Sequence, residues 1–226
     1  MYLSRFETYL RFEKKQRVDS PASSIFRALT GKEGPSGDKP IEPGVRIRDE
    51  QQKKIIFWHY NSCTVLYEDR QDYDFCINGT VNLLDRIDKI APIRELELMR
   101  FRADWILPVV NYDFKSLEQK YREHFIKQHP IFDNCSDSSV VIYMKRNKWT
   151  LHHQSGAMNI DQLQRDYRVF PMEKTKDKLF LFLGNTVESA ETIIYSNKQM
   201  KGFLDEAFKM CKNHSELFQS MMEGIL

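Results

Sequence analysis

Three charged residues alternate along one short stretch of the chain, at Arg100, Arg102 and Asp104. Residues two apart in a β-strand share a face, so this spacing gathers two guanidinium groups and one carboxylate on one side of a sheet. Guanidinium groups bind anions through paired hydrogen bonds, so the row could hold a phosphate, a carboxylate or an acidic loop of a partner. The alternative is a solvated sheet face on which the charges form cross-strand salt bridges.

Two adjacent histidines, His152 and His153, form a second group of residues that could do chemistry. Neighbouring residues of a strand point to opposite faces, so the two imidazoles cannot chelate one metal ion. A histidine beside Arg100, Arg102 and Asp104 could act as the general base of a hydrolase-like or nuclease-like site. No nucleophile signature accompanies these residues, so no catalytic residue is assigned. The alternative is a surface strand with one packed histidine.

Basic residues beside an aromatic ring form a third group. Single-stranded nucleic acid is held by this combination of charge and ring stacking. If two basic runs border hairpins of one sheet, they could lie side by side. The formal net charge of +2 instead favours solvated hairpin tips over a nucleic-acid surface. The two runs are Lys145, Arg146 and Lys148 around Trp149, and Arg46, Arg48, Lys53 and Lys54 before the first predicted hairpin.

Signatures of metal and cofactor sites are missing from the sequence. The four cysteines form no C-x-x-C pair and no zinc-like cluster with histidine, and Gly31-Lys32 lacks the spacing of a phosphate loop. We therefore expect no metal and no cofactor. No apolar run approaches the roughly 20 residues of a membrane helix, and no secretion signal follows Met1. These features predict a cytoplasmic protein without membrane contact.

The hydrophobic pattern predicts the elements that must position these residues. Residues 2–12 alternate between apolar and charged side chains, which indicates a half-buried strand. Residues 18–50 are rich in proline and glycine and predict a long loop inserted after that strand. Hairpins are expected at 55–60 with 63–67 and at 140–144 with 149–153, further strands at 96–107 and 179–183, and helices at 77–90, from Asp113, from Asn159 and at 197–222.

The order of these elements predicts one α+β domain over residues 1–226. Strands joined by hairpins form antiparallel sheets, so we expect a mostly antiparallel sheet with helices packed on one face. The long C-terminal helix should begin at Ser196, whose spacing to Gln199 is that of a capping box. Its predicted apolar stripe includes Met200, Phe208 and Met221. No internal repeat of fixed period is visible.

Four features of the chain form a recognisable set. They are the opening strand, the Arg100-Phe101-Arg102 strand ahead of Phe114 and Tyr121, the late apolar strand, and the closing helix with Phe203-Leu204, His214 and Leu217-Phe218. In this set the chain resembles a sporadically distributed family of uncharacterised prokaryotic proteins. The resemblance implies an α+β fold and a prokaryotic cytosolic setting, and no activity. The insert at 18–50 departs from the family pattern.

The leading expectation for function is a non-enzymatic binding or regulatory subunit that acts through protein–protein contacts. The amphipathic end of the last helix favours a partner protein or a homo-oligomer. Two alternatives stay open. One is a single-stranded nucleic-acid binding module that uses the basic-aromatic hairpins. The other is a hydrolase-like or nuclease-like enzyme that uses the Arg100, Arg102 and Asp104 strand with His152 and His153.

Overall fold

The computed structural model describes residues 1–12, 44–49, 51–59, 61–90, 92–126, 138–167, 179–189 and 191–224. Most of the predicted insert at 18–50 therefore lies outside the described residues. Its last part is described and forms strand β2 (Gly44–Asp49), where the composition predicted a loop. β2 pairs over its whole length with the next strand, from Gly44 opposite His59 to Asp49 opposite Lys54. The segment contains none of the prolines of the insert and alternates between apolar and charged side chains, as a strand does.

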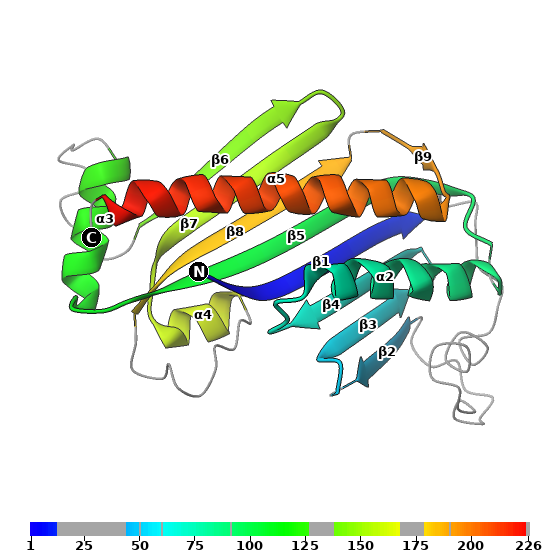
Figure 1. Cartoon of the computed structure of the whole chain (residues 1–226), viewed down its shortest axis with the longest axis horizontal. Helices are drawn as coiled ribbons and strands as arrows, with labels where there is room; N and C mark the ends of the chain where they lie inside the picture. Colours follow the sequence, from blue (N-terminus) through cyan, green and yellow to red (C-terminus); the bar gives the residue numbers. More distant parts are fainter. Residues whose placement is uncertain are drawn as a thin grey trace.

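The strands of the described residues form one nine-stranded sheet in which every pairing is antiparallel (Figure 1). The order across the sheet is β2-β3-β4-β1-β5-β8-β7-β6, and β9 pairs with the start of β5. The expected antiparallel α+β fold is confirmed. The other strand bounds are β1 (Tyr2–Phe12), β3 (Lys54–His59), β4 (Ser62–Glu68), β5 (Glu95–Val109), β6 (Ser139–Arg146), β7 (Trp149–Met158), β8 (Leu179–Ser189) and β9 (Ile193–Ile194).

The sheet consists of two halves with the same connectivity. In the first half, β1 is followed by β2, β3 and β4, which return to pair with β1, and then by helix α2 (Tyr73–Asp88). In the second half, β5 is followed by β6, β7 and β8, which return to pair with β5, and then by helix α5 (Asn197–Glu223). β1 and β5 join the halves at the centre. This repeat lies in the topology and leaves no fixed period in the sequence.

Helices α2 and α5 lie side by side on one face of the sheet (Figure 1). Helix α3 (Phe114–Phe125) packs on the same face at the end of β7, where Tyr121 donates a hydrogen bond to the Ser155 carbonyl. The apolar stripe predicted for α5 is buried except at Met221, which is exposed near the end of the helix. This face therefore carries the main hydrophobic core.

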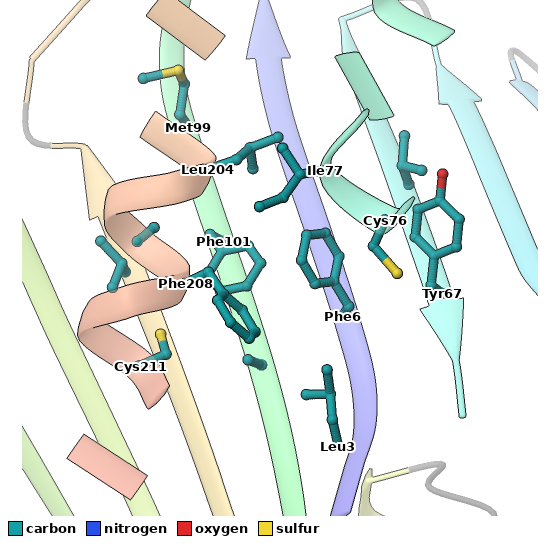
Figure 2. Packing of buried hydrophobic residues seen from close by; sticks show 14 of the residues in the cluster. Leu3, Phe6, Tyr67, Cys76, Ile77, Met99, Phe101, Leu204, Phe208 and Cys211 are labelled. Carbon is teal, nitrogen blue, oxygen red and sulfur yellow. The ribbon is translucent and has the colours of Figure 1, made fainter. Parts of the chain in front are cut away.

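Aromatic rings at the central strand pair form the middle of this core. Phe6 of β1 and Phe101 of β5 meet edge to face with ring centroids 4.8 Å apart. Phe208 of α5 lies over both rings, at 6.2 Å from Phe6 and 6.3 Å from Phe101 (Figure 2). Such rings remove large apolar areas from water, so this cluster fixes α5 over the seam between the two halves.

Helix α4 (Ile160–Tyr167) departs from the expectation that all helices pack on one face. Its buried Leu163 joins a separate small cluster with Ile106, Phe180 and Phe182. These strand residues alternate with residues of the main core, so they lie on the opposite face of the sheet. The apolar side chains of these three strand residues, together with Met158, account for this second, smaller helix contact.

Local signals explain where the helices and one strand begin and end. The strand expected at 96–107 continues through Pro108 to Val109, and Pro108 lies opposite Phe180 of β8. The pairing with β1 has already stopped at Ile106, so Pro108 lies where β5 has a described neighbour on one side only, and such a position tolerates proline. None of the described helices is long and apolar enough to cross a membrane. The helix-start side chains that accept backbone N–H bonds are Asp72, Asp113, Asn159 and Ser196.

Two helical glycines lead to opposite predictions. A methyl group at Gly79 of α2 would lie 2.4 Å from the buried Tyr67 hydroxyl oxygen, whereas one at Gly202 of α5 would meet no atom within 4 Å. We expect Gly79→Ala to lower the free energy of unfolding by about 1–3 kcal/mol through overpacking. Gly202→Ala should raise it by about 0.5–1 kcal/mol through helix propensity. Urea denaturation of both variants measures the two effects.

The Tyr67→Phe background is the control for this prediction. Removing the hydroxyl leaves the ring carbon at 3.4 Å as the nearest atom to the new methyl group, which is an ordinary contact. Most of the loss of unfolding free energy caused by Gly79→Ala should therefore disappear when the same substitution is made in the Tyr67→Phe protein. An equal loss in both backgrounds would show that the close approach to Tyr67 is not its cause.

Candidate functional site

The site lies on the open face, which we define as the side of the sheet opposite α2, α3 and α5. Its centre is formed by alternate residues of β1, β5, β8 and β7. α4 covers one end of this face through Leu163 and Phe182. The main core already occupies the other side of the same strands, so the open-face side chains are free to be polar.

Arg100, Arg102 and Asp104 lie together on the open face, as the alternation predicts. Arg100 donates through Nε to Glu188 of β8, and this contact is a cross-strand salt bridge of the kind expected for a charged sheet face. Arg102 donates through Nε to both carboxylate oxygens of Asp104, at 2.8 and 3.0 Å. Arg5 of β1 approaches Asp104 from the other side, with Nη1 3.8 Å from Oδ2.

Asp104 is fully buried although it is charged, and its neighbours explain how this is possible. Two guanidinium groups face it, and a buried carboxylate is tolerated only with such partners. Gly184, directly opposite on β8, provides the space. A side chain there would begin 3.1 Å from Asp104 Oδ1 and 2.9 Å from the Phe182 ring. Because Gly184 has no side chain, the Asp104 carboxylate and the Phe182 ring can both pack against the sheet beside it.

A pocket of about 260 Å³ occupies the middle of the open face. Three of its lining residues, Arg100, Arg102 and His152, were predicted from the sequence, and the other five come from alternating positions of β1, β7 and β8. The charged groups among them are two arginines and two glutamates, so their formal charges balance. The lining residues are Glu7, Arg100, Arg102, His152, Gln154, Gly184, Thr186 and Glu188.

The His152 side chain faces this pocket, and the ring of Tyr143 from β6 covers the imidazole. The two rings are stacked, with centroids 4.5 Å apart and planes 3° from parallel. Burial lowers the pKa of His152 below its ordinary value, and the neighbouring Arg102 lowers it further, so the imidazole is neutral at neutral pH. Its Nε2 atom is buried and has no hydrogen-bond partner among the described residues. A buried polar atom without a partner marks a position at which a ligand can supply one.

His153 lies on the other face of the sheet, in the core beneath α5. Its Nδ1 is 2.9 Å from the Asn185 side-chain oxygen, and Asn185 in turn donates to Ser215 of α5 at 2.7 Å. His214 and Phe218 of α5 pack against its ring. The adjacent histidines therefore point to opposite faces, as expected. An enzyme site that joins His153 to Arg102 does not form, because the sheet separates them.

The basic-aromatic surface predicted from the sequence does not assemble. Trp149 is only 5% exposed, packs against Phe203 and donates from its indole nitrogen to Glu206 at 3.0 Å, so its ring is not available to stack on a base. The two basic runs also lie at opposite edges of the sheet, because β1, β5 and β8 separate the two hairpins. Lys145 and Lys148 are exposed, and the side chain of Arg146 lies outside the described residues.

Within the described part of the chain, no group of three or more His, Cys, Asp or Glu side chains is placed to hold a metal ion. The described cysteines, Cys63, Cys76 and Cys211, are free and buried. Burial raises the pKa of the Cys63 and Cys76 thiols to about 12, so neither is a thiolate at neutral pH. The pocket on the open face is lined mainly by hydrogen-bonding and charged side chains.

The buried His153 makes stability dependent on pH. Burial is the main cause that lowers its pKa from 6.5 to about 4, and His214 and His152 add to it against the Asn185 hydrogen bond. The unfolded chain therefore binds a proton that the folded protein rejects, and stability falls as the pH drops through this window. From pH 7 to pH 4, the unfolding free energy of the wild type should fall by about 3 kcal/mol more than that of His153→Gln.

Chemical denaturation of both proteins across this pH range measures the difference. A difference in unfolding free energy that is the same at every pH reports the packing lost in His153→Gln. Only a difference that changes with pH reports the titration of His153. Parallel pH profiles would contradict the assignment to His153.

No protein-family model matches the chain, and no curated protein matches its sequence. The resemblance to a family of prokaryotic proteins, drawn from the spacing of residues alone, stays a prediction.

Proposed function

We propose that this protein is a non-enzymatic binding protein that holds an acidic segment of a protein partner against the open face. The observation that carries the proposal is the pocket between β1, β5, β8 and β7. Arg100 and Arg102 lie there beside Nε2 of His152, for which the described part of the chain provides no hydrogen-bond partner. The proposal belongs to the class of function that the sequence led us to expect.

The arginines are suited to a carboxylate because their geometry is already fixed. Arg100 is held through Nε by Glu188 and lies over the Tyr9 ring, with Cζ 5.5 Å from the ring centroid. A guanidinium group carries five N–H donors, and the Nε bond uses one of them. A side chain held in this way loses little conformational entropy when a second carboxylate binds to its outer nitrogens.

The size and polarity of the pocket favour one side chain of a larger partner. At about 260 Å³ it is smaller than the usual 300–1,000 Å³ of small-molecule sites, which are also mostly apolar. A carboxylate side chain would fit inside it, while the peptide around it would contact the adjacent strands. Glu7 and Glu188 share the arginines with the incoming carboxylate, which keeps the affinity moderate and the contact reversible.

The other two function classes have less support. An enzyme that uses both histidines would need His153 on the open face, whereas it lies in the core. A nucleic-acid surface built on Trp149 would need an exposed ring, whereas the indole is buried. The exposed aromatic and basic residues of the open face keep single-stranded nucleic acid as an outcome that the experiment must distinguish.

The test uses a peptide of ten glutamates and an oligothymidylate of the same length as probes, each titrated at low and at physiological salt. We expect the peptide to bind and to shift the Nε2 resonance of His152 in nitrogen-15 spectra. Arg100→Gln should weaken peptide binding about tenfold or more, because a charge-assisted hydrogen bond contributes about 1.5–3 kcal/mol. Arg86→Gln, on the exposed side of α2, is the matched control and should bind like the wild type.

Three results would contradict the proposal. The first is that the oligothymidylate binds and the peptide does not, which would assign the open face to nucleic acid. The second is that neither probe binds. The third is that the peptide binds equally well to Arg100→Gln and leaves the His152 resonance unchanged, which would place its site elsewhere.

A further inference from the structure

β6 is an outermost strand of the sheet. β6 pairs with β7 on one side, and no described strand lies along its other side (Figure 1). An outermost strand turns every second N–H and C=O group away from its sheet. Three consecutive apolar residues of β6 are also exposed, Val141 by 45%, Ile142 by 41% and Tyr143 by 72%. An unpaired backbone edge and an exposed apolar segment therefore coincide on this strand.

The positions of these three side chains indicate the shape of what can cover them. Val141 and Tyr143 lie opposite Gln154 and His152 and share the open face with them, whereas Ile142 lies opposite His153 and points to the helix side. A helix or loop docked on one face would cover only one of these sets. A strand placed alongside β6 covers both sets at once and also satisfies the free backbone groups.

The other outer strand shows how such an edge is normally protected. β2 occupies the equivalent position in the first half of the sheet and carries Arg46, Arg48 and Asp49. Charges on an edge strand prevent pairing with other strands, and so do prolines and bulges. The β6 segment from Ser139 to Met144 has no charge, no proline and no register shift against β7. Two equivalent edges thus differ in the feature that controls pairing.

We propose that β6 pairs antiparallel with β6 of a second copy of this chain and so extends the sheet across a two-fold axis. With the axis near Ile142, the apolar residues of each copy lie beside those of the other. Lys145 of one copy lies beside Ser139 of the other, so the basic ends are kept apart, whereas parallel pairing would align Lys145 with itself. The strand is therefore complementary to itself in one direction only, as a two-fold interface requires.

The test measures the oligomeric state by sedimentation velocity over a wide range of protein concentration. We expect a monomer–dimer equilibrium that Ile142→Lys and Val141→Lys each weaken by at least tenfold, because the two substitutions place a charge on opposite faces of the same new strand pair. Leu217→Lys, at a 64% exposed apolar position on α5, is the matched control and should dimerise like the wild type. Amide hydrogen exchange of residues 139–146 should slow as the concentration rises.

The outcomes distinguish strand pairing through β6 from the other ways in which the chain could associate. A wild-type monomer at every concentration overturns the proposal. A dimer that Leu217→Lys weakens and the β6 variants do not would place the interface on α5 and also overturn it. Sensitivity to Ile142→Lys but not to Val141→Lys would indicate docking on one face instead of strand pairing. Thermal unfolding shows whether each variant is folded. The proposal is independent of peptide binding at the pocket, so either can fail without the other.

Discussion

The antiparallel pairing of β1 with β5 is the interaction on which both the core and the pocket depend. It is the only link in the described sheet between two halves that otherwise pair within themselves. Because side chains alternate along both strands, the register that places Phe6 and Phe101 under α5 also places Glu7 opposite Arg102 on the open face. A shift by one residue would exchange the two sets of side chains, sending charges into the core and rings into solvent.

Asp104 resists such a shift. Its carboxylate is buried and faces Arg5 from β1 and Arg102 from its own strand, and its backbone carbonyl accepts a hydrogen bond from the Ser4 hydroxyl. Any other register would leave this carboxylate without the guanidinium of β1, and a buried charge that loses a partner costs about 3–5 kcal/mol. The same group that positions Arg102 in the pocket thus also selects the alignment of the two halves.

The sequence predicts those parts of the structure that depend on how apolar and polar side chains alternate over a few neighbouring residues. The alternation of β1, the row at Arg100, Arg102 and Asp104, and the stripe of α5 depend only on neighbours along the chain, so pattern and structure agree there. Trp149 was placed on the surface because lysines flank it, but contacts with Phe203 and Glu206, more than fifty residues away, bury it. The pocket was missed for the same reason: Glu7, Thr186 and Gln154 meet only once the strand order is known, and no local pattern encodes that order.

The central seam has a consequence for how the chain reaches this structure. The hydrogen bond from Ser4 to Asp104 joins residues that are 100 positions apart, so β1 must wait for β5 during synthesis on the ribosome. Until then β1 can pair only with β4, and its other edge stays unoccupied. Closing so long a loop is entropically costly, and contacts of this separation slow folding. The first half must therefore keep an open edge in the nascent chain until β5 emerges, and an unpaired strand edge of this kind is a site at which chains can pair wrongly.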